Sequence, residues 1–187
     1  MGIILIGIII FLFFSYINKQ PKGVLLELVS NKSIFGPLSQ LDIELIKKMN
    51  IYGNNSKYTK REIIIFKRFI LLDIFYTVRN KGVMQKDCEI IIKDIDLFFQ
   101  KKYSYELGGF GKKQILERFK FYTESLGKFN EDNSDFTSEE VLDLFEKGDL
   151  GGFSINPIMS LYVKNYILSI IIAKNELINI YIKLDNN

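Results

Sequence analysis

The segment 108–113, GGFGKK, contains the residue types that can hold an anion. Backbone N–H groups at the start of a helix bind phosphate, and neighbouring lysine ammonium groups add positive charge. The candidate anion site consists of Gly109, Gly111, Lys112 and Lys113. Its spacing differs from the Walker loop, and the residues before it predict a helix instead of the strand that precedes a dinucleotide loop. The pattern therefore gives little support for a small-molecule ligand.

A second copy of the glycine pattern argues for a structural role. Residues 106–111 read ELGGFG and residues 149–154 read DLGGFS, but no lysine follows the glycines of the second copy. Glycine supplies the tight and left-handed backbone conformations that end helices. We therefore predict that both copies are joints between helices.

Few side chains in this sequence suit catalysis or metal binding. Histidine is absent and Cys88 is the only cysteine, so Ser–His and Cys–His units and cysteine-rich zinc sites are excluded. The acidic segment 130–141 lacks the central glycine of a calcium-binding EF-hand loop. Four carboxylates could do acid–base chemistry, although their spacing matches no known pair: Asp94, Asp96, Glu106 and Glu117. The sequence thus favours a non-catalytic protein without a metal or other cofactor.

Charge is distributed unevenly along the chain. Ten basic residues lie between Lys47 and Lys86, whereas eight acidic residues and one lysine lie between Glu131 and Asp149. We expect the basic tract to face anionic lipid or an acidic partner. The residues assigned to this surface are Lys57, Lys60, Arg61, Lys67 and Arg68. Nucleic acid is a poorer fit, because the nearby phenylalanines fall on the apolar side of the predicted helix.

The first 18 residues carry no charge and are rich in Ile, Leu and Phe. About 17 residues at 1.5 Å rise span about 25 Å, close to the ~30 Å hydrocarbon core of a bilayer. A cleaved signal peptide would need a basic start and a small-residue cleavage site, and neither is present. We therefore predict a single-pass transmembrane anchor over 1–18 that contacts membrane lipid. Lysines follow it closely, which places the C-terminal domain in the cytoplasm.

The remainder of the chain predicts a linker and then a helical domain. Residues 19–37 contain two of the three prolines and two glycines, and they are interpreted as a linker. Residues 38–187 form the domain, with capping-box spacings at Ser39/Asp42 and Thr59/Glu62. Glycine stops follow the predicted helices. Six helices are predicted, at 40–50, 59–80, 85–102, 111–126, 138–147 and 157–184.

Two of these helices have informative patterns. Charges interrupt the apolar stripe of 59–80, so this helix is predicted to be amphipathic. Residues 165–173, NYILSIIIA, are apolar on nearly every side, so the last helix is predicted to be the central one.

These observations predict an all-α protein with an N-terminal transmembrane helix and a compact bundle of about six helices. The function that fits best is a non-catalytic interaction or accessory protein that binds a protein partner at the membrane surface. Two alternatives remain open at this point. One is an outward-facing cell-envelope hydrolase that uses carboxylates, and the other is a membrane-anchored immunity or defence factor.

Overall fold

The computed structural model describes residues 21–30, 32–51, 56–108, 112–132, 145 and 157–185. This part of the chain contains six helices and no strands, which confirms the predicted all-helical fold. The helices are α2 (Pro21–Leu28), α3 (Gln40–Ile51), α4 (Ser56–Asn80), α5 (Gln85–Lys102), α6 (Lys112–Asp132) and α8 (Pro157–Asp185). The predicted anchor over 1–18 and most of the predicted helix over 138–147 lie outside the described residues. None of the helices that are described is both long and apolar enough to cross a membrane.

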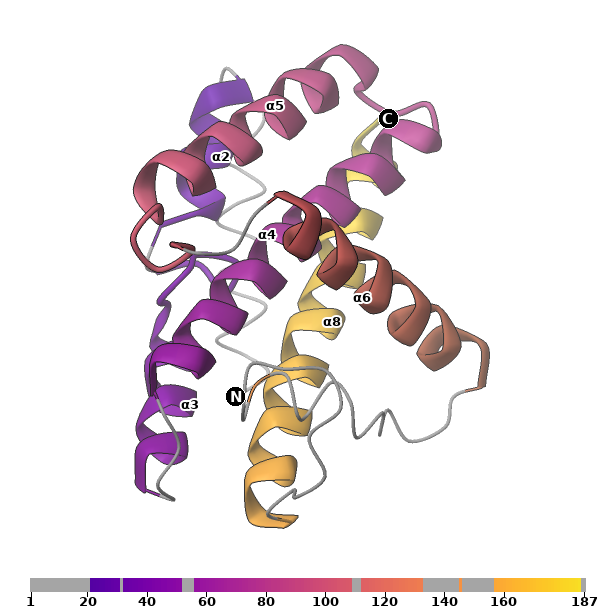
Figure 1. Cartoon of the computed structure of the whole chain (residues 1–187). Helices are drawn as coiled ribbons and strands as arrows, with labels where there is room; N and C mark the ends of the chain where they lie inside the picture. The colour runs from indigo at the N-terminus through magenta and orange to yellow at the C-terminus, as the bar shows by residue number, and fades with distance from the viewer. Residues whose placement is uncertain are drawn as a thin grey trace.

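Helix α4 is the centre of the bundle, and α3, α5, α6 and α8 all pack against it (Figure 1). Every side chain from Glu62 to Leu72 is buried, so this stretch has no solvent face. The predicted amphipathic pattern of 59–80 fails in this stretch, because Glu62, Lys67 and Arg68 are buried together with the apolar residues. The prediction that the last helix is central was also wrong, since α8 leaves Leu161 and Ile172 56% and 52% exposed.

The predicted linker over 19–37 is wrong for most of the segment that the structure describes. Pro21 begins helix α2. Proline is favoured at this position because N–H groups in the first helical turn have no partner within the helix, so the lack of an N–H breaks no hydrogen bond. Helix α2 packs on α5 and buries Val24, Leu25 and Leu28 in the core. Phe35, in the turns after α2, is also buried. This segment is therefore part of the domain.

Several helix ends agree with the sequence signals. Gly82 has a φ of 85°, its N–H donates to the Arg79 carbonyl at 2.9 Å, and Val83 N–H donates to the Val78 carbonyl at 3.3 Å. These two bonds form a Schellman motif that ends α4. At the start of α3, Ser39 N–H donates to Asp42 Oδ2 at 2.7 Å, which is one half of the predicted capping box.

Two other end signals do not coincide with helix ends in the structure. Helix α4 begins at Ser56, so Thr59 lies inside the helix and is not its cap. The Thr59 hydroxyl donates instead to the Phe145 carbonyl at 3.1 Å. Helix α6 continues past the predicted stop at Gly127 and ends at Asp132.

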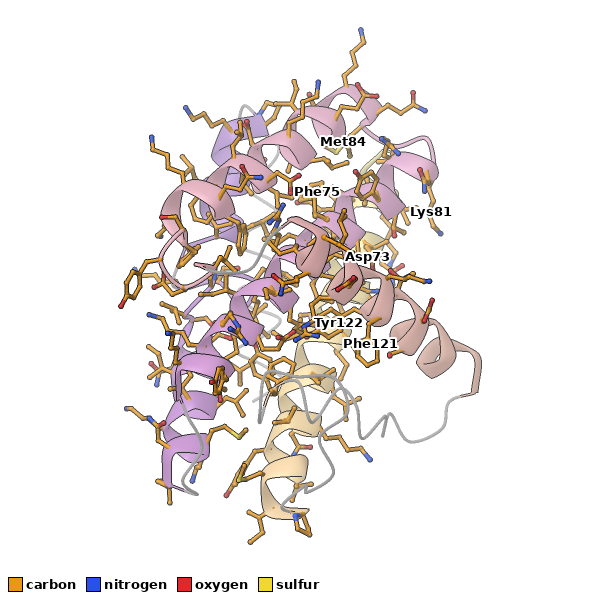
Figure 2. The ribbon with its side chains drawn as sticks, in the orientation of Figure 1. Asp73, Phe75, Lys81, Met84, Phe121 and Tyr122 are labelled. Atoms are coloured by element: carbon orange, nitrogen blue, oxygen red, sulfur yellow. The ribbon has the colours of Figure 1, made fainter. Side chains whose placement is uncertain are left out.

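Aromatic rings hold the middle of the bundle together. The Phe66 ring on α4 lies 5.0 Å from Tyr122, 5.8 Å from Phe145 and 6.4 Å from Tyr166, measured between ring centroids. Figure 2 shows Tyr122 between α6 and the central helices. Because aromatic pairs contribute about 0.5–1.5 kcal/mol beyond their buried area, this cluster joins α4, α6 and α8 strongly.

Gly36 provides a test of the packing between α2 and α3. A β-carbon at this position would overlap the Ser30 carbonyl oxygen, which belongs to the backbone and cannot rotate away. We predict that Gly36→Ala lowers the free energy of unfolding by about 1–3 kcal/mol, as measured by urea unfolding. Gly82→Asn is the control. Gly82 has open space around it and Asn tolerates its left-handed backbone, so this change should cost less than about 1 kcal/mol. Equal losses in the two variants would contradict this account.

Candidate functional site

Helix α4 holds one fully buried ion pair with α3. Lys67 Nζ lies 3.1 Å from Asp42 Oδ1, and both side chains have zero exposure. The Tyr166 hydroxyl of α8 donates to the same carboxylate oxygen at 2.7 Å, and the Ser39 hydroxyl donates to Oδ2 at 2.9 Å. Lys67 also donates to the Ile34 carbonyl. Burial lowers the pKa of Lys67, and the charge of Asp42 offsets this only in part.

One turn earlier, α4 holds a second buried cluster with α6. The Tyr122 hydroxyl donates to Glu62 Oε1, and Arg118 Nε lies 3.6 Å from Glu62 Oε2. Glu62 has zero exposure, and Arg118 retains 7%. Burial raises the pKa of Glu62, although the Arg118 charge, the Tyr122 hydrogen bond and the Arg61 charge oppose the rise. Burial likewise raises the pKa of Tyr122 well above its ordinary value.

The same arrangement connects α4 to its other two neighbours. Arg68 donates to Asp96 of α5 through Nη2 at 2.9 Å and through Nε at 3.1 Å. Lys174 of α8 donates to Asp73 at 2.8 Å. Each helix that packs on α4 therefore makes at least one ionic contact with it. Asp42 and Glu62 are fully buried, whereas Asp96 and Asp73 are 45% and 33% exposed. Setting the register of packed helices is the best-attested role of buried charge in proteins.

The buried clusters do not form an accessible active site. Asp42, Glu62 and Lys67 have zero exposure, so no substrate reaches them in the folded protein. Two of the four carboxylates considered for acid–base chemistry are in ion pairs: Asp96 pairs with Arg68, and Glu106 accepts from Lys60 at 2.9 Å. This hydrogen bond lowers the pKa of Glu106. In the part of the chain that the structure describes, no group of three or more acidic or thiol side chains could hold a metal ion.

The predicted basic surface is only partly a surface. For Lys67 the prediction was wrong, because its ammonium group is buried against Asp42. Arg68 is likewise buried and paired with Asp96. Lys60 pairs with Glu106, and Arg61 stacks over Tyr58 with its guanidinium carbon 5.2 Å from the ring centroid. Lys57 is exposed.

The glycine motif lies between α5 and α6, as expected of a joint. Leu107 is buried, its N–H donates to the Tyr103 carbonyl at 2.9 Å, and Gly108 N–H donates to the Tyr105 carbonyl at 3.1 Å. The second copy and Gly109 and Gly111 of the anion-site candidate lie outside the described residues. Lys113 is 90% exposed and lies 4.0 Å from Glu117.

A groove of about 660 Å³ lies on the surface where α5 and α6 diverge over α4. Apolar side chains predominate in its lining: Leu72, Leu107, Ile115, Leu116 and Phe119. The Arg68–Asp96 ion pair, Tyr76, Gln100, Ser104 and Gly108 complete its lining. Leu116 and Tyr76 remain 55% and 42% exposed, so the groove is open to solvent. This groove could not be predicted from the sequence, because its lining residues come from separate segments of the chain.

Comparisons of the chain with protein-family models, with curated proteins and with solved structures give no match.

The Asp42–Lys67 pair predicts a large loss of stability when one partner is removed. Lys67→Met leaves the Asp42 carboxylate buried without a counter-charge, and the free energy of unfolding should fall by about 3–5 kcal/mol. Urea unfolding of the full chain in detergent measures this. Lys120→Met is the matched control, since Lys120 is 79% exposed and its loss should change stability by about 0.5 kcal/mol or less. In the double variant Asp42→Asn/Lys67→Met the loss should be smaller than the sum of the single losses, and strict additivity would argue against the pair.

The raised pKa of Glu62 predicts a pH-dependent effect of Glu62→Gln. In the unfolded chain this carboxyl ionises near 4.5, whereas in the folded protein it keeps its proton to higher pH. The wild-type protein therefore loses stability relative to Glu62→Gln as the pH rises from 4.5 to the folded-state pKa, and the difference is constant above that. Urea unfolding between about pH 4 and pH 8 tests the trend. Glu124→Gln, which also removes one carboxyl but at a side chain that is 61% exposed, is the matched control. A difference that shrinks with rising pH would contradict the assignment.

Proposed function

We propose that the protein is a membrane-anchored, non-catalytic adaptor that binds a protein partner at the membrane surface. Residues 1–18 form its single-pass anchor, and the helical domain lies in the cytoplasm. The anchor proposal is supported by the uncharged, Ile- and Phe-rich sequence of this segment and by the lysines that follow it. The adaptor proposal depends chiefly on the groove between α5 and α6.

The chemistry of the groove suits a partner helix. An amphipathic helix binds by laying its apolar face in a hydrophobic groove, with anchor residues spaced three or four apart. Leu72 and Phe119 supply an apolar floor and wall, and Leu116 stands at the open edge. The Arg68–Asp96 pair lies within the lining, where it offers polar contacts that would orient such a helix. The partner expected here is a protein segment with an apolar helical face.

The ionic contacts of α4 support a binding role over catalysis. Glu62 and Lys67 are sealed inside the bundle, and Asp96 and Glu106 are in ion pairs with Arg68 and Lys60. The groove therefore offers a shaped apolar surface with one neutralised ion pair. Such a surface fits recognition of another protein better than hydrolysis.

A matched pair of leucine variants tests the adaptor proposal. Leu116 in the groove and Leu161 on α8 are exposed to the same degree, 55% and 56%. We predict that a stoichiometric partner co-purifies with the detergent-solubilised full chain and with Leu161→Glu. Leu116→Glu should lower the affinity for this partner at least about tenfold, because it places a charge in an apolar contact. Repeated absence of a stoichiometric partner, or equal loss in both variants, would argue against the groove as a binding site.

A further inference from the structure

The solvent face of α5 carries lysines and large apolar residues in alternation. In chain order this stripe contains Lys86, Ile90, Lys93, Leu97 and Lys101. Their spacing of three or four residues places them on one face of the helix, opposite the buried Cys88 and Ile95. Ile90 and Leu97 are 47% and 64% exposed, and the three lysines are exposed as well.

Helix α2 extends this stripe on one side. Lys22 is exposed and Leu26 is 55% exposed, one turn apart on α2. Both residues line a groove of about 660 Å³ together with Leu97, Phe98 and Lys101 of α5. Figure 1 shows α2 beside α5 in the bundle. Exposed leucines next to lysines are typical of a surface that enters the headgroup region of a bilayer.

Chain connectivity brings this surface close to the membrane. The proposed anchor ends at residue 18, and α2 begins at Pro21. Three residue steps span at most about 10 Å, so the first turn of α2 must lie near the bilayer surface if the anchor is inserted. Lys22 belongs to that first turn, and Leu97 and Lys101 line the same groove as Lys22.

We propose that this surface, the lipid face, lies on an anionic bilayer. It is defined by Lys22, Leu26, Lys86, Ile90, Lys93, Leu97 and Lys101. The lysines pair with anionic headgroups and the apolar side chains enter the interface. The proposal rests on the proposed membrane anchor over residues 1–18. It adds the orientation of the domain relative to the bilayer and the class of lipid that the domain contacts.

The charge balance of the lipid face agrees with an anionic partner. Its four lysines are opposed by three acidic groups at its edges: Glu89, which is exposed, and Asp87 and Asp94, which are partly exposed. A second set of basic residues, which includes Lys47 and Lys57, lies at the end of α3 and the start of α4. That set is separated from the anchor by α2 and the turns after it, so the short connection to residue 18 favours the lipid face.

A fluorescent probe at position 97 tests the lipid face in the full chain. Leu97→Cys is labelled with an environment-sensitive dye and incorporated into vesicles containing lipids with a nitroxide near the headgroup. Cys88 does not compete for the dye, because it is buried and its pKa is raised to about 11. Leu161→Cys, at a side chain of similar exposure on α8, is the control position.

In vesicles of phosphatidylglycerol and phosphatidylcholine, quenching at position 97 should exceed quenching at 161 at least about threefold. It should fall towards the value at 161 in phosphatidylcholine alone and in the variant Lys93→Glu/Lys101→Glu. Lys47→Glu/Lys57→Glu reverses the same number of charges and should leave the quenching unchanged.

Three results would overturn the proposal, and each has a different meaning. If the full chain does not float with vesicles after an alkaline wash, the anchor fails and the lipid face fails with it. If the chain floats but positions 97 and 161 are quenched equally, the anchor stands and only the lipid face is wrong. If dyes at position 97 quench each other regardless of lipid charge, the face is a contact between copies of the chain.

Discussion

Charge buried inside α4 is the constraint on which the rest of this bundle depends. The helix is surrounded by protein from Glu62 to Leu72, yet this stretch contains three charged residues. An unpaired charge in such a place costs several kcal/mol, so each one needs a partner from another helix. Glu62 finds Arg118 and Tyr122 on α6, Lys67 finds Asp42 on α3, and Arg68 finds Asp96 on α5. Asp73, which is labelled in Figure 2, lies just beyond this stretch and pairs with Lys174 of α8. Together these pairs connect α4 to all four helices that pack against it.

The elements of the fold could be predicted from local signals, but their roles could not. Glycine and proline mark the end of α4 and the start of α8, because they act through the backbone of their own residues. Helix α2 was missed, because a segment of eight residues that begins with Pro21 and includes Gly23 resembles a linker unless its packing on α5 is known. The charges of α4 suggested a solvent face, since a sequence does not show that Asp42 lies 25 positions away and in contact. Thr59 and Glu62 matched a capping box, since the sequence does not show that Thr59 lies inside α4 and donates to Phe145.

The site was harder to predict than the fold, because it depends on which lysines remain at the surface. The basic tract between residues 47 and 86 suggested a lipid or partner surface from composition alone. Burial removes Lys67 and Arg68 from that surface, and Lys60 is neutralised by Glu106. Of the three lysines on the outer side of α5, Lys93 and Lys101 lie beyond this tract and Lys86 lies at its end. They are fewer than the basic residues of the tract, but they share one face of the helix. Their spacing was present in the sequence and could have been recognised by testing the helix 85–102 for alternation of lysine and apolar residues on its outer side.

Helix α5 connects the two proposed surfaces. One edge of it, with Asp96, borders the groove towards α6, and the other, with Asp94 and Lys101, borders α2. If the outer side of α5 lies on the bilayer, the groove opens beside the membrane, and a helix bound in it would lie close to the headgroups. A partner that is itself held at the membrane would then meet the groove in two dimensions instead of three, which raises its effective concentration. A groove with a modest apolar area would thus be sufficient for a membrane-held partner, whereas the same groove on a freely diffusing domain would need a larger contact to bind as tightly.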